Sequence, residues 1–426
     1  MITLDRTKAP QFNELDELTF IHPETHFLAN GVKVNVLSGG SQEIVKIDFI
    51  FKAGTYHQTK PLVASATNNL LKEGTKNYTA FEIAEGIDQF GAYLQTSADF
   101  DDATITLYTL NMHLKSVLDY FKEVVVLPAF DQNEFNIYIN NALEKFKVSM
   151  EKVSYVARKE SMQQIFGSDN PYGANATIKD FEKIAREDII KFHHNFYRLS
   201  NCEIIVAGKV TDECINLLNH FFGDIDTSKT THTNTPLINI ENEQPNKIFI
   251  EKENSLQSAI RIGKQFPNKL HPDYFGLQIL NTILGGYFGS RLMKNIREEK
   301  GYTYGISSGI LSLQHGGFFY ISTEVGAAVT NETLAEIYKE IKLLQTKKIG
   351  TEELNLVRNY LLGVVLKSCD GPFNMAEMFE NVYFYGLDYD FYNRYIQKIK
   401  SITAEELKDL ANKYLINLKE TVVGQL

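Results

Sequence analysis

Apolar and polar positions alternate with two different periods near the start of the chain, and they predict a strand followed by a helix. Residues 45–61 (VKIDFIFKAGTYHQTKP) have the alternation of a strand that runs into a glycine turn. Residues 62–75 (LVASATNNLLKEGT) have the pattern of a short helix that stops at a glycine. The spacing i, i+3 and i+4 places Ser65, Asn68 and Asn69 on one face of that helix. Three small polar residues on one helical face indicate either a solvated surface or a functional site without its usual side chains.

The same order of predicted elements occurs twice in the chain. Residues 184–210 and residues 402–426 each predict an amphipathic helix, a polar turn and a β-rich strand. Three pairs of residues keep one constant offset of 218 residues: Ile184 and Ile402, Glu187 and Glu405, and Phe196 and Tyr414. Upstream, a strand at 103–110 followed by two helices matches a strand at 318–325 followed by two helices. The chain therefore reads as two copies of one unit.

This repeat predicts an α+β fold with two homologous domains, each a mainly antiparallel sheet with helices packed on one face. We expect the domains at residues 1–223 and 248–426. Residues 224–247 are polar, rich in Thr and Asn, and without helical period, which predicts a linker.

Composition narrows the class of protein. The 426 residues are 43% hydrophobic and 23% charged, as in a soluble globular protein, and the net charge is −10. This charge argues against nucleic acid or an anionic membrane as the main partner. Three cysteines without metal-binding spacing indicate reduced, buried thiols. Because no signal peptide or long apolar run is present, we expect a cytoplasmic protein, or a periplasmic one if a leader was removed.

The second half contains a more specific pattern at residues 276–309 (GLQILNTILGGYFGSRLMKNIREEKGYTYGISSG). An apolar helix is expected to break at Gly285–Gly286, and a second helix is expected from about Ser290 to Lys300. Arg297 lies on that second helix, and Tyr304 follows seven residues later in the turn into a strand. On composition alone, Arg297 is best read as one more charge on an exposed helix and Tyr304 as a core aromatic of the strand.

The chain resembles the pitrilysin/insulinase family of inverted zinc peptidases over nearly its whole length. In that family a strand and glycine turn lead into a helix that carries the zinc-binding sequence HxxEH and ends in a Gly-Thr turn. Gly74–Thr75 matches this turn and fixes the register. Counting back, the two His positions of HxxEH fall on Ser65 and Asn69, and its Glu falls on Asn68.

The resemblance also implies what the first half lacks. Two His residues at i and i+4 can bind one Zn²⁺, and the Glu before the second His acts as the general base. Ser and Asn are poor zinc ligands, and Asn cannot serve as a base. The family's third ligand, a helical Glu, would fall near Glu144. We therefore expect a degenerate zinc site that binds no metal in this chain.

Other histidines do not suggest a replacement metal site. His22 and His26 are spaced i, i+4, but Pro23 and the lack of a helical pattern remove the required geometry. His193 and His194 are adjacent and point to different sides of a helix. His57 precedes the polar-faced helix and is the only histidine near it in sequence.

The second-half pattern resembles the family's signature of a Gly-rich break, an SRL helix, an Arg and, seven residues on, a Tyr. In active members this pair faces the zinc, holds the substrate backbone and helps to stabilise the oxyanion. Some bacterial members divide the work between two half-size chains, of which one bears HxxEH and the other supplies Arg and Tyr. The resemblance thus implies a non-catalytic subunit that needs a paralogous HxxEH-bearing partner, with zinc held by the partner and a peptide as substrate.

An alternative is a self-associating peptide-binding or structural protein of the same fold, possibly a homodimer, without a peptidase role. An active enzyme with an unrecognised metal site is the third possibility, and the histidine inventory gives it least support. Whether the chain takes part in catalysis therefore depends on the surroundings of Arg297 and Tyr304.

Overall fold

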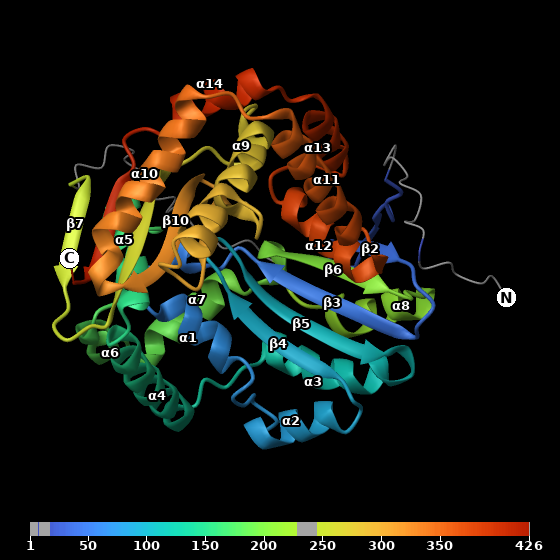
Figure 1. Ribbon diagram of the computed structural model, residues 1–426. Coiled ribbons are helices and arrows are strands. Elements are labelled where there is room, and N and C mark those ends of the chain that lie inside the picture. The colour runs from blue at the N-terminus through green and yellow to red at the C-terminus, as the bar shows by residue number, and fades with distance from the viewer. Residues whose placement is uncertain (1–6, 8–17, 228–244, 426) are drawn as a thin grey trace.

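A computed structural model describes residue 7, residues 18–227 and residues 245–425. It contains two sheets, one formed by each half of the chain (Figure 1). The first sheet has the strand order β1-β2-β6-β3-β5-β4. Its strands are β1 (Glu24–Phe27), β2 (Lys33–Ser38), β3 (Ile44–Phe51), β4 (Tyr93–Ala98), β5 (Ala103–Leu110) and β6 (Cys202–Gly208). The second sheet has the order β7-β11-β8-β10-β9. Its strands are β7 (Lys247–Glu251), β8 (Gln257–Gln265), β9 (Ile306–Leu313), β10 (Gly316–Gly326) and β11 (Lys419–Gly424).

The two sheets have the same topology, which confirms the predicted repeat. β2 pairs with β6 in parallel, as β7 pairs with β11. The pairs β6–β3, β3–β5 and β5–β4 are antiparallel. The corresponding pairs β11–β8, β8–β10 and β10–β9 are antiparallel as well. β1 is an additional antiparallel edge strand in the first sheet. The predicted linker lies mainly in residues 228–244, outside the described residues, between α8 and β7.

The helices follow the same repeat. The first half contains α1 (Val63–Leu70), α2 (Ala80–Asp88), α3 (Leu114–Val126), α4 (Gln132–Met150), α5 (Val153–Phe166), α6 (Ile178–Lys183), α7 (Arg186–Phe196) and α8 (Asp212–Phe222). The second contains α9 (Tyr274–Asn281), α10 (Thr330–Thr346), α11 (Thr351–Ser368), α12 (Gly371–Tyr383), α13 (Asp390–Ser401) and α14 (Ala404–Tyr414). Short helical segments are η1 (Thr55–His57), η2 (Asn111–His113), η3 (Leu199–Asn201) and η6 (Ala327–Val329), and two π-helical segments are η4 (Thr282–Gly286) and η5 (Met293–Glu299). No helix in the described part is both long and apolar enough to cross a membrane.

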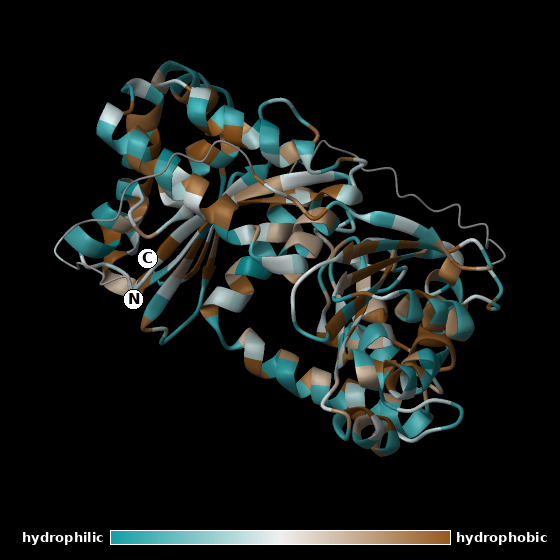
Figure 2. Ribbon diagram, turned by 90° about the vertical axis from the view of Figure 1, so that its right-hand side faces the viewer, coloured by the Kyte–Doolittle hydropathy of each residue, from teal (hydrophilic) through white to brown (hydrophobic). Residues whose placement is uncertain are grey.

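Alternation along the strands gives each sheet two buried faces. In β3, Phe49 packs in the main core of the first half, whereas Ile50 points to the opposite face. The predicted layer of helices covers the first of these faces. The second face receives a helix from the other half: Met378 and Phe379 of α12 pack near Ile50. Hydropathy colouring shows the apolar residues concentrated on the strands and on the helix surfaces that cover them (Figure 2).

The second sheet receives a helix from the first half in the same way. Val156 and Ala157 of α5 pack against Ala259 of β8 and Val423 of β11. Gln164 of α5 also donates to the carbonyl oxygen of Glu420, at 3.3 Å. This reciprocal exchange of α5 and α12 buries apolar surface of both halves. The halves are therefore held together by core packing as well as by the chain that connects them.

Candidate functional site

The polar face predicted on residues 62–75 lies on α1, where its three residues are held by bonds within the first half. The Ser65 hydroxyl donates to the carbonyl oxygen of Leu62, at 3.1 Å, in the first turn of the helix. The Asn69 amide donates to the carbonyl oxygen of Ser65, at 2.7 Å, and to the Tyr138 hydroxyl of α4, at 3.4 Å. Burial raises the pKa of Tyr138, while its hydrogen bonds with Ser65 and Asn69 act in the opposite direction. Ser65 and Asn69 thus join α1 to α4.

Asn68 points into the core of the first half. It is fully buried, and its amide donates to the Tyr197 hydroxyl at 3.1 Å. Its Oδ1 is also buried and accepts no hydrogen bond from the described residues. Burial raises the pKa of Tyr197 above its ordinary value, so its hydroxyl stays neutral. Neutral groups therefore surround the position that a general base would occupy.

Glu144 is not brought to this cluster. Its side chain is exposed and forms an ion pair with Lys147 at 2.8 Å. Tyr138, which does reach Asn69, precedes Glu144 by six residues on α4, so the two side chains leave different faces of that helix. A hydroxyl and two amides without a neighbouring carboxylate do not fit Zn²⁺, which binds Cys, His and carboxylate ligands. In the described part of the chain, no three His, Cys, Asp or Glu side chains are placed to hold a metal.

Arg297 and Tyr304 are brought together, and both reach the surface. The Nε of Arg297 donates to the carbonyl oxygen of Tyr304 at 3.0 Å. The guanidinium carbon lies 4.7 Å from the centre of the Phe288 ring, which is a cation–π contact. The Tyr304 side chain is 96% exposed, and the Nη groups of Arg297 make no hydrogen bond to the described residues. Phe288, Arg297 and Tyr304 are hereafter the Arg/Tyr cluster, in which Arg297 and Tyr304 present unused donors to solvent.

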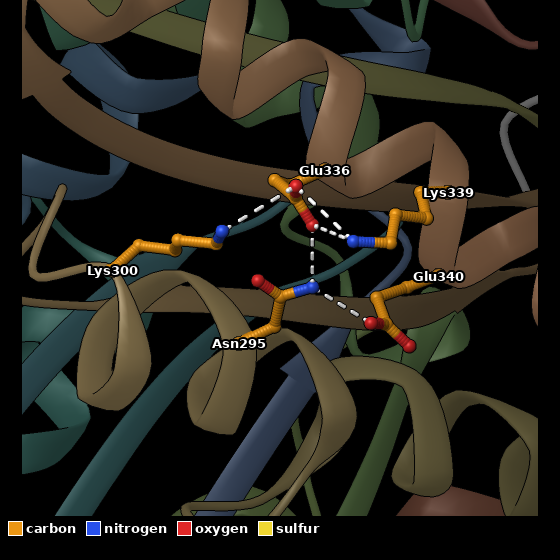
Figure 3. A network of polar contacts seen from close by, with 5 residues as sticks. All are labelled: Asn295, Lys300, Glu336, Lys339 and Glu340. Atoms are coloured by element: carbon orange, nitrogen blue, oxygen red, sulfur yellow. Dashed lines mark hydrogen bonds and ion pairs between the residues drawn. The ribbon is translucent and has the colours of Figure 1, made fainter.

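The segment that carries Arg297 is anchored on both sides. The predicted helix at Ser290–Lys300 is present, although most of it, η5, is π-helical. Figure 3 shows how the buried Asn295 joins η5 to α10, donating to Glu336 at 2.8 Å and to Glu340 at 2.7 Å. Lys339 and Lys300 add ion pairs to Glu336, at 2.9 and 3.8 Å (Figure 3). These bonds fix the orientation of η5.

Two further contacts fix the start and the end of this segment. Arg291 makes a bidentate ion pair with Glu353 of α11, with both N–O distances at 2.7 Å. After η5, the Thr303 hydroxyl donates to the carbonyl oxygen of Glu324 in β10, at 2.7 Å. The turn that carries Tyr304 is therefore attached to a central strand of the second sheet. A rigid support of this kind is what a preorganised binding group requires.

The predicted glycine break has a steric cause. A Cβ on Gly285 would lie 2.6 Å from the Ser308 hydroxyl oxygen and 2.7 Å from the Ser308 backbone nitrogen. Glycine alone allows η4 to approach β9 this closely. The break turns the chain from η4 towards Phe288 and η5, and so it places the Arg/Tyr cluster at the surface.

The structure adds residues that sequence reasoning missed. Tyr138 and Tyr197 complete the polar contacts of α1 from positions 69 and 129 residues away in the chain. Phe288 was passed over because an aromatic residue inside a glycine-rich stretch has no periodic signal. In the pattern LGGYFGSRL, glycines flank Tyr287 and Phe288 and set them apart from the helices on either side. This is the one sequence feature that indicates exposure of Phe288.

Comparison with known proteins supports the resemblance inferred from the sequence. Residues 36–173 match the family model described as insulinase (peptidase family M16), and residues 183–361 match that of the peptidase M16 inactive domain. A Bacillus subtilis protein named uncharacterized zinc protease YmxG is 23% identical, covering 80% of this chain and 83% of its own length. A Helicobacter pylori protein named non-peptidase homolog YmxG is 24% identical, covering 80% of this chain and 78% of its own length.

A solved structure extends the similarity to the whole fold. The peptidase M16 inactive domain from Pseudomonas fluorescens is 25% identical, with a TM-score of 0.84, and the match covers 95% of this chain and 98% of that one. The two M16 models together match most of the chain, and both halves have the duplicated topology. The chain therefore belongs to peptidase family M16.

Proposed function

We propose that this chain is the non-catalytic subunit of a heterodimeric zinc peptidase. In this proposal a paralogous, HxxEH-bearing subunit holds the zinc and the general base, and this chain supplies Arg297 and Tyr304. The pair holds the peptide backbone of the substrate and stabilises the oxyanion that forms in the partner's site. No cofactor is assigned to this chain.

The state of α1 supports the first part of the proposal. Ser65, Asn68 and Asn69 are engaged in hydrogen bonds within the first half, and Asn68 is fully buried. A helix that served hydrolysis would need an ionisable base open to a bound water. The H. pylori relative that carries the name non-peptidase homolog agrees with an inactive member of the family.

The Arg/Tyr cluster carries the second part. Its single most informative feature is the combination of a 96% exposed Tyr304 with an Arg297 whose Nη groups have no described partner. An arginine is always charged, and its planar donors suit a carbonyl oxygen that gains negative charge. A phenol hydroxyl beside it can donate to the same oxygen. Because η5 is anchored through Asn295 and Arg291, these donors need little reorganisation when a peptide binds.

Reconstitution with an HxxEH-bearing family chain of similar length from the same genome tests this proposal. Each of Arg297→Ala and Tyr304→Phe is expected to lower kcat/KM of the pair about 10²- to 10³-fold, as for loss of one oxyanion donor. Arg394→Ala and Tyr93→Phe are matched controls, because both residues are exposed and lie away from the cluster. Size-exclusion chromatography establishes that all four variants assemble. Unchanged kcat/KM in both cluster variants would overturn the catalytic role.

The alternative is a self-associating, peptide-binding or structural protein of the same fold. The non-peptidase name of the H. pylori relative favours it as much as it favours an inactive subunit. Peptide binding by a homodimer, with no gain of peptidase activity from any HxxEH-bearing chain, would select this alternative.

A further inference from the structure

A pocket of about 770 Å³ lies between α9, α11, α12 and α13 of the second half. These four helices lie beside one another in Figure 1. Much of the pocket wall is aromatic, with rings from Tyr274, Phe275, Phe391, Tyr392 and Tyr395. Volumes of this size fit small ligands or a few residues of a peptide. None of the residues discussed for the degenerate zinc site or the Arg/Tyr cluster lines it.

The wall also contains polar groups: besides the tyrosine hydroxyls, the lining includes the side chains of Lys269, Lys367, Glu377, Asn374 and Asn381. The Tyr392 hydroxyl donates to the carbonyl oxygen of Met378 at 2.9 Å, and the Tyr274 hydroxyl accepts from Gln278 at 2.8 Å. The Tyr395 hydroxyl, in contrast, has no hydrogen-bond partner among the described residues, although burial raises its pKa. Tyr395 is partly buried, and its hydroxyl can donate to a ligand carbonyl.

One face of α11 connects this pocket with the Arg/Tyr cluster. The Tyr360 ring contacts the Tyr287 ring in a tilted arrangement, with ring centres 4.7 Å apart, and Tyr287 directly precedes Phe288 of the cluster. Val364 lies one turn after Tyr360 on the same face, and it lines the pocket together with Ser368. Tyr360 and Val364 are both exposed apolar residues. The face therefore forms a continuous apolar path from the cluster to the pocket.

The length of this path suits an extended peptide. From Tyr360 to Ser368 the helix rises about 12 Å, at about 1.5 Å per residue. An extended chain covers the same distance with about three or four residues, at about 3.3 Å each. Because this distance starts at Tyr360 and not at Arg297, a peptide held at Arg297 needs more than three or four extended residues to reach the pocket.

We propose that the pocket between α9, α11, α12 and α13 binds an aromatic side chain of the peptide held at Arg297. The inference rests on the proposed function, and it adds a substrate class: flexible peptides with a Phe or Tyr side chain several residues from the held backbone. Aromatic walls favour an aromatic ligand because offset and edge-to-face ring pairs stabilise beyond the burial of area alone. The Tyr395 hydroxyl donates to a carbonyl of the same peptide.

Direct binding to the full chain tests the pocket without any partner subunit. The probes are fluorescein-labelled ten-residue peptides of Gly, Ser and Ala with one central Phe, and matched peptides with Leu or Ala at that position. Burial of a Phe side chain should make the Phe peptide bind roughly 10- to 100-fold more tightly than the Ala peptide. The Leu peptide should lie between them. Fluorescence anisotropy gives the dissociation constants.

Two variants block the pocket, and one matched variant does not. Val364→Arg places a charge at the pocket wall, and Ser368→Trp fills it from the end of α11. Leu366→Arg is the control, because Leu366 is 54% exposed on the same helix, compared with 42% for Val364, and does not line the pocket. Each blocking variant should reduce the Phe-to-Ala ratio to about 1, and the control should keep it. Circular dichroism and thermal unfolding identify any variant that fails to fold.

The outcomes separate this proposal from the proposed function. Arg297→Ala should weaken the Phe and Ala peptides by the same factor and so leave their ratio unchanged. Equal binding of the Phe and Ala peptides by the parent chain, or a ratio that survives both blocking variants, would overturn the pocket proposal. A normal ratio together with no weakening by Arg297→Ala would instead overturn peptide holding at the Arg/Tyr cluster.

Discussion

The two halves of this chain have one topology but treat corresponding sites in opposite ways. α1 follows β3 in the first half, as α9 and η4 follow β8 in the second. On α1 the polar side chains are turned to neighbouring elements, and Asn68 is fully buried. After η4 the chain instead presents Arg297 and Tyr304 to solvent. Polar residues on this duplicated topology therefore indicate function when their unused donors are open to solvent, as at Arg297, and not when the unused atom is buried, as at Asn68.

This difference has an energetic counterpart. The polar contacts of α1 are single bonds between neutral groups, which contribute about 1 kcal/mol each to the free energy of unfolding. Those that support η5 involve carboxylates: Asn295 binds Glu336 and Glu340, and Arg291 binds Glu353 on both oxygens. Hydrogen bonds to charged groups are roughly twice as strong. We infer that polar contacts in the second half fix the orientation of the segment that carries Arg297. In the first half, polar contacts instead occupy the positions where the zinc ligands and the base would lie.

The largest expected effect comes from removing the amide that joins η5 to α10. Asn295→Leu leaves the buried carboxylate of Glu340 without its donor, at 2.7 Å in the parent. The loss of free energy of unfolding should be about 2–3 kcal/mol. Asn68→Leu leaves the buried Tyr197 hydroxyl without its partner but also removes an amide oxygen that already lacks one, and both groups are neutral, so its cost should be about 1 kcal/mol.

Urea unfolding of both variants measures this contrast between the halves. Lys339→Met is the control for the network, because it removes an exposed ion pair to Glu336 and should leave the free energy of unfolding nearly unchanged. Equal costs for Asn295→Leu and Asn68→Leu would show that the two sites are supported alike.

A smaller effect on stability is expected from protonation of His193, which lies on α7 and contacts Tyr197. Its ring stacks on Tyr197, and burial lowers its pKa from 6.5 to about 4. The unfolded chain binds this proton more readily than the folded one, so stability is full above pH 6.5 and falls as the pH drops towards 4. The contribution of His193 to this loss should be about 1–2 kcal/mol at pH 5.

His193→Phe tests this by making the free energy of unfolding less dependent on pH between 6.5 and 5. The adjacent His194 is exposed, and His194→Phe should keep the pH dependence of the parent. If both variants show the same dependence of the free energy of unfolding on pH as the parent, then protonation of His193 does not destabilise the first half.

Local sequence patterns predicted the repeat. The features that they did not predict depend on packing between segments that are far apart in the chain. The repeated succession of helices and strands followed from periodicity and the 218-residue offset, whereas the order of the strands within each sheet was not predicted. The exchange of α5 and α12 depends on apolar faces more than 100 residues from their targets, so no local pattern encodes it. The helix at Ser290–Lys300 was expected, but not its π-helical form.

The candidate site shows the same division. The resemblance to the family signature, with its seven-residue spacing, suggested Arg297 and Tyr304 as a pair, and a bond from Arg297 to the Tyr304 carbonyl does join them. The exposure of the Tyr304 side chain follows from that bond and from the anchor of Thr303, neither of which is visible in the sequence. Counting along the chain suggested Glu144 as a third ligand, whereas helical phase relative to Tyr138 turns it to solvent. The catalytic roles of the pair remain predictions.

The smallest expected effect is on metal binding, where the parent chain should show none. A hydroxyl and two amides replace the imidazoles and the base, and the only carboxylate suggested as a ligand, Glu144, pairs with Lys147 on another face of α4. We expect no stoichiometric zinc by metal analysis after dialysis against trace zinc. The triple change Ser65→His, Asn68→Glu and Asn69→His should bind zinc only weakly in a chelator competition, because two His ligands lack the third. The glutamate introduced at the buried position of Asn68 would also stay protonated beside Tyr197, so it could not serve as a base. Tight one-to-one zinc in the parent chain would contradict the degenerate site, and with it the contrast between a filled first site and an open second one.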